Sequence, residues 1–177
     1  MTKSPTDVAG NPPFAIREGG LDDARVRALI THHYTTARSQ TACDSAHALD
    51  PDQLNTPDIR FFAAWDGDVV AAIGALKRLS STHGEIKSMH TAASHRRRGA
   101  GNAVLEHLMG AARDMGMTRV SLETGSRPFF DAARAFYARG GFSECPPFEG
   151  YTDDPNSVYM TIEFSAPSEG RATRSPR

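Results

Sequence analysis

The order of apolar and polar positions along residues 14–164 alternates between strand-like and helix-like patterns. Apolar side chains at every second position predict strands, and apolar side chains three and four positions apart predict amphipathic helices. Strands are predicted at residues 14–17, 61–65, 69–79, 85–91 and 119–123, followed by one beginning at Phe142 and one over residues 158–164. Helices are predicted over about residues 22–34, 99–115 and 129–139, with a short one near residues 50–54.

Turn residues indicate how these elements follow one another. Asp66-Gly67-Asp68 stands between two apolar runs, and an Asp-Gly pair tolerates the positive φ angles of a tight hairpin turn. Gly116 is placed to end the helix that precedes it. The pattern predicts an α/β fold of the α+β type, with a mixed, mostly antiparallel central sheet of about six or seven strands and helices on both faces.

A basic, glycine-rich turn joins the strand at residues 85–91 to the helix that follows it. The turn reads Arg96-Arg97-Arg98-Gly99-Ala100-Gly101. The first N–H groups of a helix have no intrahelical partner and lie at the positive end of the helix dipole, so they bind phosphate readily. The two glycines let a phosphate approach the backbone, and the arginines add positive charge. The turn therefore predicts a ligand that carries phosphate.

Two common phosphate-binding motifs do not fit this turn. A P-loop ends in Gly-Lys followed by Ser or Thr, and that ending is missing from the sequence. A dinucleotide fingerprint needs a third glycine near Val104 and an acidic residue about 20 positions later in a parallel βαβ unit. The sequence does not meet these requirements. The ligand is therefore expected to be of another class.

The turn resembles the coenzyme A signature of the GNAT acetyltransferase superfamily, Arg/Gln-x-x-Gly-x-Gly/Ala, through Arg96, Gly99 and Gly101. A second segment, residues 133–142, is similar to the family's Ala-x-x-Leu/Phe-Tyr-x-x-x-Gly-Phe marker. The resemblance covers about residues 14–164. Within the family, the chain resembles the small bacterial YsnE-like branch at residues 74–77, 85–89, 123–125, 147–148 and 157–160.

The resemblance implies a GNAT fold in which the strands at residues 85–91 and 119–123 run parallel and splay apart. Acetyl-CoA would enter this cleft, with its pantetheine arm along residues 89–91 and its pyrophosphate on the basic turn. The implied cofactor-binding residues are Met89, His90, Thr91, Arg96, Arg97, Arg98, Gly99, Ala100, Gly101, Asn102, Phe136 and Tyr137. Many family members carry an asparagine seven residues before the motif tyrosine, where this chain has Phe130, so that cofactor contact is not expected here.

An amine acceptor must lose a proton before it attacks, because an alkylammonium is not a nucleophile. Glu85 is the first candidate for the base, directly or through a water, with Glu123 and Asp131 as weaker candidates. The alternative for Glu85 is a surface carboxylate or an ion pair with Lys87. Tyr137 matches the family's tyrosine, which implies a general acid for the departing thiolate; core packing is the alternative.

Composition narrows the function further. The chain has 177 residues, which indicates one domain. Its net charge of −1 argues against a nucleic-acid partner. Its two cysteines are too few for a disulfide framework and predict a reducing compartment. The start of the chain has no signal-peptide pattern and the longest apolar run is too short for a membrane span, so no membrane partner and a cytoplasmic location are expected. His32 and His33 lack metal-ligand spacing, so no metal is expected.

The sequence thus predicts disordered ends at residues 1–12 and 165–177 around a GNAT domain at residues 13–164. The predicted function is an acetyl-CoA-dependent N-acetyltransferase acting on a primary amine of a small molecule or peptide. Direct attack in a ternary complex is favoured, because no cysteine stands beside a histidine; Cys145 is the alternative nucleophile. A non-catalytic acyl-CoA-binding regulatory or partner-binding module is the alternative function, and the resemblance leaves a homodimer open.

Overall fold

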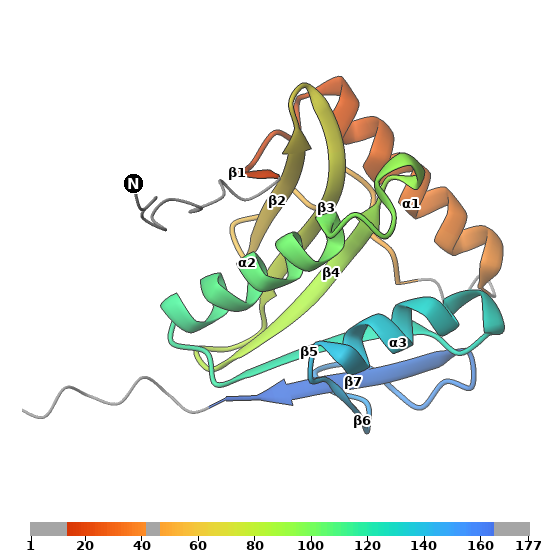
Figure 1. Ribbon diagram of the computed structural model, residues 1–177. Helices are drawn as coiled ribbons and strands as arrows, with labels where there is room; N and C mark the ends of the chain where they lie inside the picture. Colours follow the sequence, from red (N-terminus) through yellow and green to blue (C-terminus); the bar gives the residue numbers. More distant parts are fainter. Residues whose placement is uncertain (1–13, 42–46, 165–177) are drawn as a thin grey trace, which may run out of the picture.

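The computed structural model describes residues 14–41 and 47–164 (Figure 1). The strands are β1 (Ala15–Glu18), β2 (Ile59–Asp66), β3 (Val69–Arg78), β4 (His83–Thr91), β5 (Arg119–Gly125), β6 (Ser143–Cys145) and β7 (Ser157–Glu163). The helices are α1 (Ala24–Gln40), α2 (Ala100–Asp114) and α3 (Asp131–Arg139), with short 3₁₀ turns at Ala93–His95 and Pro128–Phe130. The predicted disordered ends lie outside the described residues.

All seven strands form one mixed sheet in the order β1-β2-β3-β4-β5-β7-β6. Neighbouring strands are antiparallel except β4 and β5, which are parallel, so the predicted fold class is confirmed. The hairpin turn is also confirmed, because Asp66 pairs with Val69 and Gly67 has a φ of 57°. The predicted disposition of the parallel pair, residues 85–91 beside residues 119–123, is the one observed.

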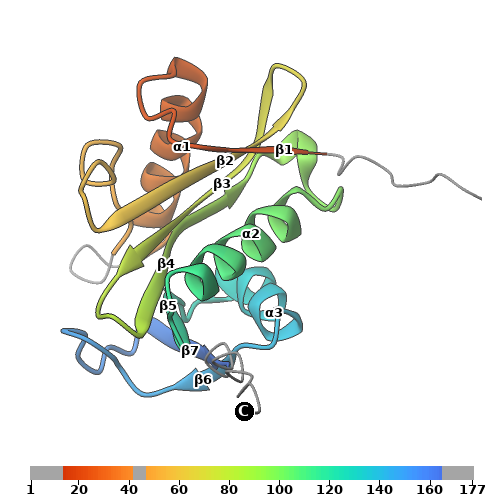
Figure 2. The same ribbon diagram turned by 90° about the vertical axis from the view of Figure 1, so that its left-hand side faces the viewer.

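Helices cover both faces of the sheet (Figure 2). On one face Val26 and Ile30 of α1 pack against β2 and β3 in a core that includes Phe61, Trp65 and Ile73. On the other face α2 and α3 cover a second core, which includes Phe62, Leu76, Val104, Leu108, Leu122 and Tyr137. Alternate strand residues supply the two cores, as strand geometry requires. The sheet therefore separates an α1 side from an α2–α3 side.

The short helix predicted near residues 50–54 is wrong. The carboxylate of Asp50 accepts hydrogen bonds from the backbone N–H groups of Asp52 and Gln53, both at 2.9 Å, and the segment forms a turn. Such a side chain offers the backbone an alternative to a helix. Leu54 is fully buried and anchors the turn against the α1 core.

A β-bulge interrupts β4 at its middle. Ala75 of β3 pairs with Lys87 and Ile73 pairs with His90, so Ser88 and Met89 together face Gly74. Ser88 has a φ of 54°, in the left-handed region. A bulge bends its strand, and the last rung between β4 and β5 is Ile86 with Leu122, just before the bulge. Beyond it the two strands diverge (Figure 1).

Gly74→Ala is expected to destabilise the protein by roughly 1–3 kcal/mol, because small-to-large changes force a packed core apart. A Cβ at Gly74 would lie 2.6 Å from the Met89 sulfur and 2.8 Å from Val104 Cγ1. Thermal unfolding measures the loss. Gly110→Ala on α2 is the matched control: its Cβ meets nothing within 4 Å, so we expect no loss of stability. Equal melting temperatures for the two variants would contradict the packing argument.

Candidate active site

The turn between β4 and α2 ends in a helix start whose first backbone N–H groups have no partner within the helix. Gly99 caps α2 in the left-handed region at a φ of 91°, and the helix begins at Ala100. The first backbone bond of the helix start runs from the N–H of Ala103 to the carbonyl of Gly99, at 3.0 Å. The N–H groups of Ala100, Gly101 and Asn102 therefore precede the helical ladder and lie at the positive end of the α2 dipole.

The two glycines give this turn the shape of an anion cradle. A Cβ at Gly99 would meet nothing within 4 Å, so the space above the backbone is open there. A Cβ at Gly101 would lie 2.9 Å from the Thr91 hydroxyl and 3.7 Å from the ring of Phe136. The helix start is thus uncovered at Gly99 and closely bordered at Gly101. The residues present fit a diphosphate, and its binding at this turn stays a prediction.

The three arginines of the turn have different surroundings. All three are exposed, and Arg96 lines the cavity described below. Arg98 forms an ion pair with Asp66 at 3.0 Å, and the same carboxylate lies 3.2 Å from Nε2 of the buried His95. Asp66 therefore ties both the 3₁₀ turn and Arg98 to the end of β2. This connection was not expected from the sequence.

A cavity of about 390 Å³ lies where β4 and β5 part. Its lining residues come from both strands, the basic turn, α1 and the segment after it, the loop before α3, and α3 itself: His33, Thr36, Ala37, Thr41, His47, Ala48, Ile86, Lys87, Ser88, Met89, His90, Arg96, Glu123, Thr124, Gly125, Phe129, Phe130, Ala132, Ala133 and Tyr137. Past Ile86, the described part of β4 has no rung to β5, so its edge is available to a ligand. The Ser88 hydroxyl is buried without a hydrogen-bond partner among the described residues.

Tyr137 reaches this cavity from α3. Its side chain is buried, and burial together with the charge of Glu123 raises the pKa of the phenol, which stays protonated at neutral pH. Within residues 14–41 and 47–164, the Tyr137 hydroxyl makes no hydrogen bond and is free to meet a ligand. The ring packs edge-to-face on Phe136, which borders Gly101. Two consecutive residues of α3 therefore contact the cavity and the start of α2.

Glu85 is held in a buried polar cluster on the α1 side of the sheet. Only 3% of the residue is exposed, and one carboxylate oxygen accepts from the Tyr151 hydroxyl at 2.6 Å and from the Lys87 ammonium at 3.1 Å. Lys87 also donates to the Tyr151 oxygen at 2.9 Å. The ion pair between Glu85 and Lys87, one of the two sequence interpretations, is therefore present. Lys87 lines the cavity, and Glu85 does not.

Glu123 lies on the same face of the sheet as Glu85. Glu85 pairs with Ser121 in the parallel ladder, and strand alternation places Glu123 on the same side two residues later. Its carboxylate lines the cavity and accepts a hydrogen bond from Ser157 at 2.7 Å. Burial raises the pKa of Glu123 above the ordinary glutamate value. The structure therefore places a carboxylate and the Tyr137 phenol at one cavity from opposite sides of the sheet.

Three histidines meet between α1 and β4. The ring of His90 contacts His32 at 5.4 Å and His33 at 5.3 Å between centroids. Burial lowers the pKa of His90 and of His33 to about 4, so both are neutral at physiological pH. Among the described residues, no group of three or more His, Cys, Asp or Glu side chains is arranged to hold a metal ion.

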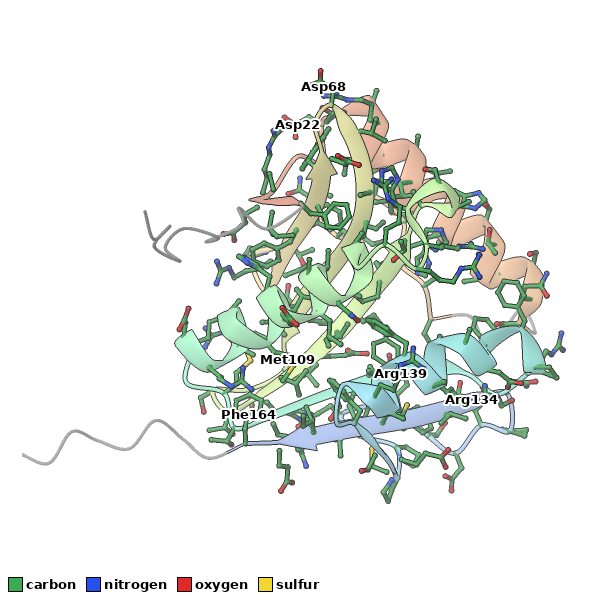
Figure 3. All side chains as sticks on the ribbon, viewed as in Figure 1. Asp22, Asp68, Met109, Arg134, Arg139 and Phe164 are labelled. Carbon is green, nitrogen blue, oxygen red and sulfur yellow. The ribbon has the colours of Figure 1, made fainter. Side chains whose placement is uncertain are left out.

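The loop between β5 and α3 carries residues that sequence reasoning did not place. Phe130, which replaces the family's asparagine, packs on Gly125, where a Cβ would lie 2.2 Å from its ring. Arg134 of α3 (Figure 3) donates to the Gly125 carbonyl and pairs with Asp131. Asp131, a weaker candidate for the base, is thus paired and does not line the cavity.

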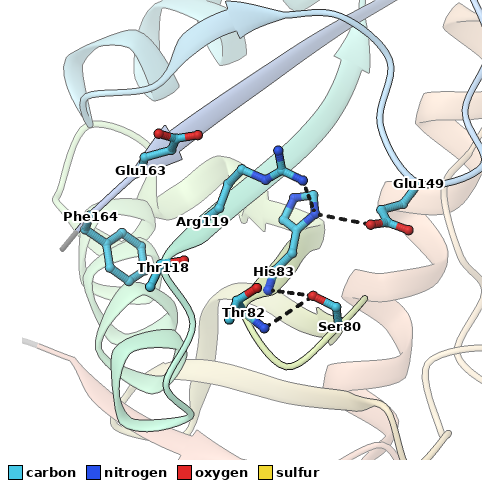
Figure 4. A pocket seen from close by; sticks show the side chains of 8 residues that line it. All are labelled: Ser80, Thr82, His83, Thr118, Arg119, Glu149, Glu163 and Phe164. Carbon is cyan, nitrogen blue, oxygen red and sulfur yellow. Dashed lines mark hydrogen bonds and ion pairs between the residues drawn. The ribbon is translucent and has the colours of Figure 1, made fainter. Parts of the chain in front are cut away.

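A second, more open hollow of about 720 Å³ lies at the other end of β4 and β5 (Figure 4). There His83, which is buried, accepts from Arg119 at 2.8 Å and bonds Ser121 at 2.8 Å. The two strands are still paired at this end, through His83 and Arg119. This hollow is therefore separate from the splayed cleft and from the basic turn.

The predicted cofactor residues lie around the splayed cleft. Met89, His90, Arg96 and Tyr137 line the cavity. Thr91 and Phe136 border Gly101 at the start of α2, and Arg97 lies on the exposed turn with a φ of 60°. A glycine-rich helix start, a splayed parallel pair and a tyrosine between them define the class of acetyltransferases with the GNAT fold.

The chain belongs to the acetyltransferase (GNAT) family, whose profile matches residues 26–142. It is 44% identical over 146 residues to an uncharacterized N-acetyltransferase, YsnE, of Bacillus subtilis, covering 82% of this chain and 97% of that protein. It is 38% identical over 156 residues to another, YedL of Escherichia coli, covering 88% and 98%. The identity to the IAA acetyltransferase of Azospirillum brasilense is 34%, covering 81% and 93%. The predicted family is confirmed.

Solved structures share the fold. A Klebsiella pneumoniae protein matches with a TM-score of 0.69 at 27% identity, covering 88% of this chain and 100% of that one. The PaiA N-acetyltransferase of Thermoplasma acidophilum, in complex with coenzyme A, matches with a TM-score of 0.67 at 12% identity, covering 85% and 99%. In the described residues of our chain, no helix is long and apolar enough to cross a membrane.

Proposed function

We propose that this protein transfers an acetyl group from acetyl-CoA to the primary amine of a small molecule or peptide. The observation that carries the proposal is the cavity at the splay of β4 and β5, with the Tyr137 phenol in its lining and the glycine-rich start of α2 beside it. The named functions of the bacterial relatives support the acyl transfer. The acceptor and the mechanism are our proposals.

The chain offers two binding surfaces to the cofactor. The N–H groups at residues 100–102 and the arginines before them would hold the pyrophosphate, since several donors and a helix dipole converge there. The edge of β4 at residues 89–91 would pair with the pantetheine amides as an added strand does. When bound, acetyl-CoA supplies an activated acyl group as a thioester.

The cavity has a proton donor and proton acceptors on opposite sides. Tyr137, neutral because burial raises the pKa of its phenol, would protonate the departing thiolate. On the α1 side Glu85, through a water, or Glu123 would take the proton of the acceptor ammonium. Glu123 borders the cavity, whereas Glu85 reaches it only past Lys87. The roles of the two carboxylates can be separated by substitution.

Direct attack by the amine is the mechanism that we propose. Cys145 lies on β6, does not line the cavity, and has a thiol whose pKa is raised by burial. A thiol with a raised pKa holds less thiolate and is a poorer nucleophile. An acyl-enzyme on Cys145 is therefore disfavoured. The cytoplasmic location, the homodimer and the domain limits at residues 13 and 164 stay predictions.

A panel of amines tests the proposal. The purified chain is incubated with acetyl-CoA and aliphatic amines, aromatic amines, amino acids or short peptides, and both free thiol and acetylated product are measured. We expect at least one amine to raise thiol release well above the rate without amine, with a product heavier by one acetyl group. Thiol release that is equal with and without every amine would contradict the proposal.

A further inference from the structure

The mouth of the cavity has an apolar rim. Phe129 is 54% exposed, one of two large apolar side chains that are exposed in the described part of the chain. It lines the cavity beside Phe130, and Ala37 and Ala48 line it from α1 and the segment that follows. Exposed apolar surface at the edge of a cavity marks a binding region, because a ligand that covers it removes that surface from water.

The phenylalanine rim, Phe129 and Phe130, belongs to the α1 side of the sheet. Gly125 and Glu123 are two residues apart on β5, so a Cβ at Gly125 would point to the same side as the Glu123 side chain. That Cβ would meet the ring of Phe130 at 2.2 Å, so Phe130 covers β5 on the side of Glu123. Glu123 and the rim therefore border the same half of the cavity.

Local contacts hold the rim in place. Phe130 and Phe129 pack edge-to-face with centroids 5.1 Å apart. Arg127, just before them, donates to the carbonyl of Gln40 at the end of α1, at 3.2 Å. Arg134 bonds the carbonyl of Gly125 beneath the rim. A fixed apolar surface binds a ligand at a lower entropic cost than a mobile one.

We propose that the acceptor is an amine carried on an apolar body of about the size of an aromatic ring, which the phenylalanine rim receives while the amine lies at Glu123. The inference rests on the proposed function. The rim and the carboxylate lie on one face, opposite the helix from which Tyr137 reaches the cavity. An aromatic body would pack on Phe129 edge-to-face or offset-stacked. A short polar amine would leave the Phe129 ring in water.

The test compares 2-phenylethylamine with ethylamine in the wild type and in Phe129→Ala. The two amines share the ammonium and differ only in the ring. We expect kcat/KM to favour 2-phenylethylamine by at least about tenfold in the wild type, and the ratio to fall toward one in Phe129→Ala. Val69→Ala, at the other exposed apolar side chain, is the control and should keep the wild-type ratio.

Two further measurements keep the outcome unambiguous. If Phe129→Ala raises the KM for acetyl-CoA equally with every amine and leaves the ratio unchanged, the rim serves the cofactor and the inference is overturned. Calorimetry on the CoA-saturated protein compares N,N-dimethyl-2-phenylethylamine with N,N-dimethylethylamine, neither of which forms a stable acetamide. Ring-dependent binding that Phe129→Ala removes supports the inference even if no amine is acetylated, while binding without ring dependence overturns it.

Discussion

Tyr137→Phe is expected to lower kcat by about 100-fold, within the range for loss of a general acid. The substitution removes one hydroxyl that has no hydrogen bond among the described residues, so the ring and its contacts with Phe136 and Phe142 stay in place. Because burial raises the pKa of the phenol, the wild-type donor stays protonated through the alkaline range in which the amine loses its proton. Steady-state rates of thiol release measure the change.

The control for this variant separates catalysis from binding. Tyr34 lies on α1, and its ring packs on Arg38. Tyr34→Phe removes a hydroxyl at this position and is expected to keep the wild-type kcat. CoA affinity from calorimetry should be unchanged in Tyr137→Phe, because the basic turn and the β4 edge are untouched. If Tyr137→Phe keeps the wild-type kcat, or loses CoA affinity in proportion to its loss of rate, Tyr137 is not the general acid.

Local signals predicted most of the fold. The hairpin at Gly67, the cap at Gly99 and the helix end at Gly116 each need a positive φ, and each has one. Glycine marks such positions in a sequence because it alone adopts them without strain. The basic turn followed from its own arginines and glycines, and the splayed pair was implied by the family resemblance. Elements that are fixed by neighbours in the sequence were therefore predictable.

The cavity walls were less predictable, because they depend on contacts between distant residues. The bulge at Ser88 has a positive φ at a serine, so no glycine at that position indicates the bulge in the sequence. Glu85 and Tyr151 are 66 residues apart and meet at 2.6 Å, which no periodicity indicates. Sequence reasoning ranked Glu85 above Glu123 because Glu85 lies on the strand that was expected to line the cleft. In the structure Glu123 lines the cavity, whereas Glu85, which is bonded to Lys87 and Tyr151, does not.

The charges along the cleft suit a reaction between an acyl-CoA and an amine. Around His90 the nearby charged or chargeable groups are His32, His33 and Arg96, all basic. Around Glu123 they are Lys87, Glu85 and Asp154, two of them acidic. His33 and His90 are neutral, so the positive charge at the cofactor end comes from the arginines of the basic turn and attracts an anion there, while the end near Glu123 accepts an ammonium. Opposite charges at two ends of one cavity orient two different ligands.

Glu123→Gln is expected to lower kcat/KM by about 100-fold if Glu123 is the base. The base must be ionised to accept a proton, and burial raises the pKa of Glu123. In the wild type, kcat/KM should therefore fall as the pH drops through a value above the ordinary glutamate pKa of 4.5. The variant should lose this acidic limb. Initial rates across the pH range, at an amine free-base concentration held constant well below KM, measure both effects.

Stability separates the two carboxylates independently of activity. A carboxyl whose pKa is raised by folding binds more protons when folded, so its ionisation lowers stability as the pH rises through that range. Glu123→Gln should therefore melt no lower than the wild type at pH 7. Glu85→Gln leaves the Lys87 ammonium buried without its counter-charge and should cost about 3 kcal/mol. If Glu85→Gln loses the acidic limb while Glu123→Gln keeps it, Glu85 is the base and Glu123 a neighbour that only tunes the cavity.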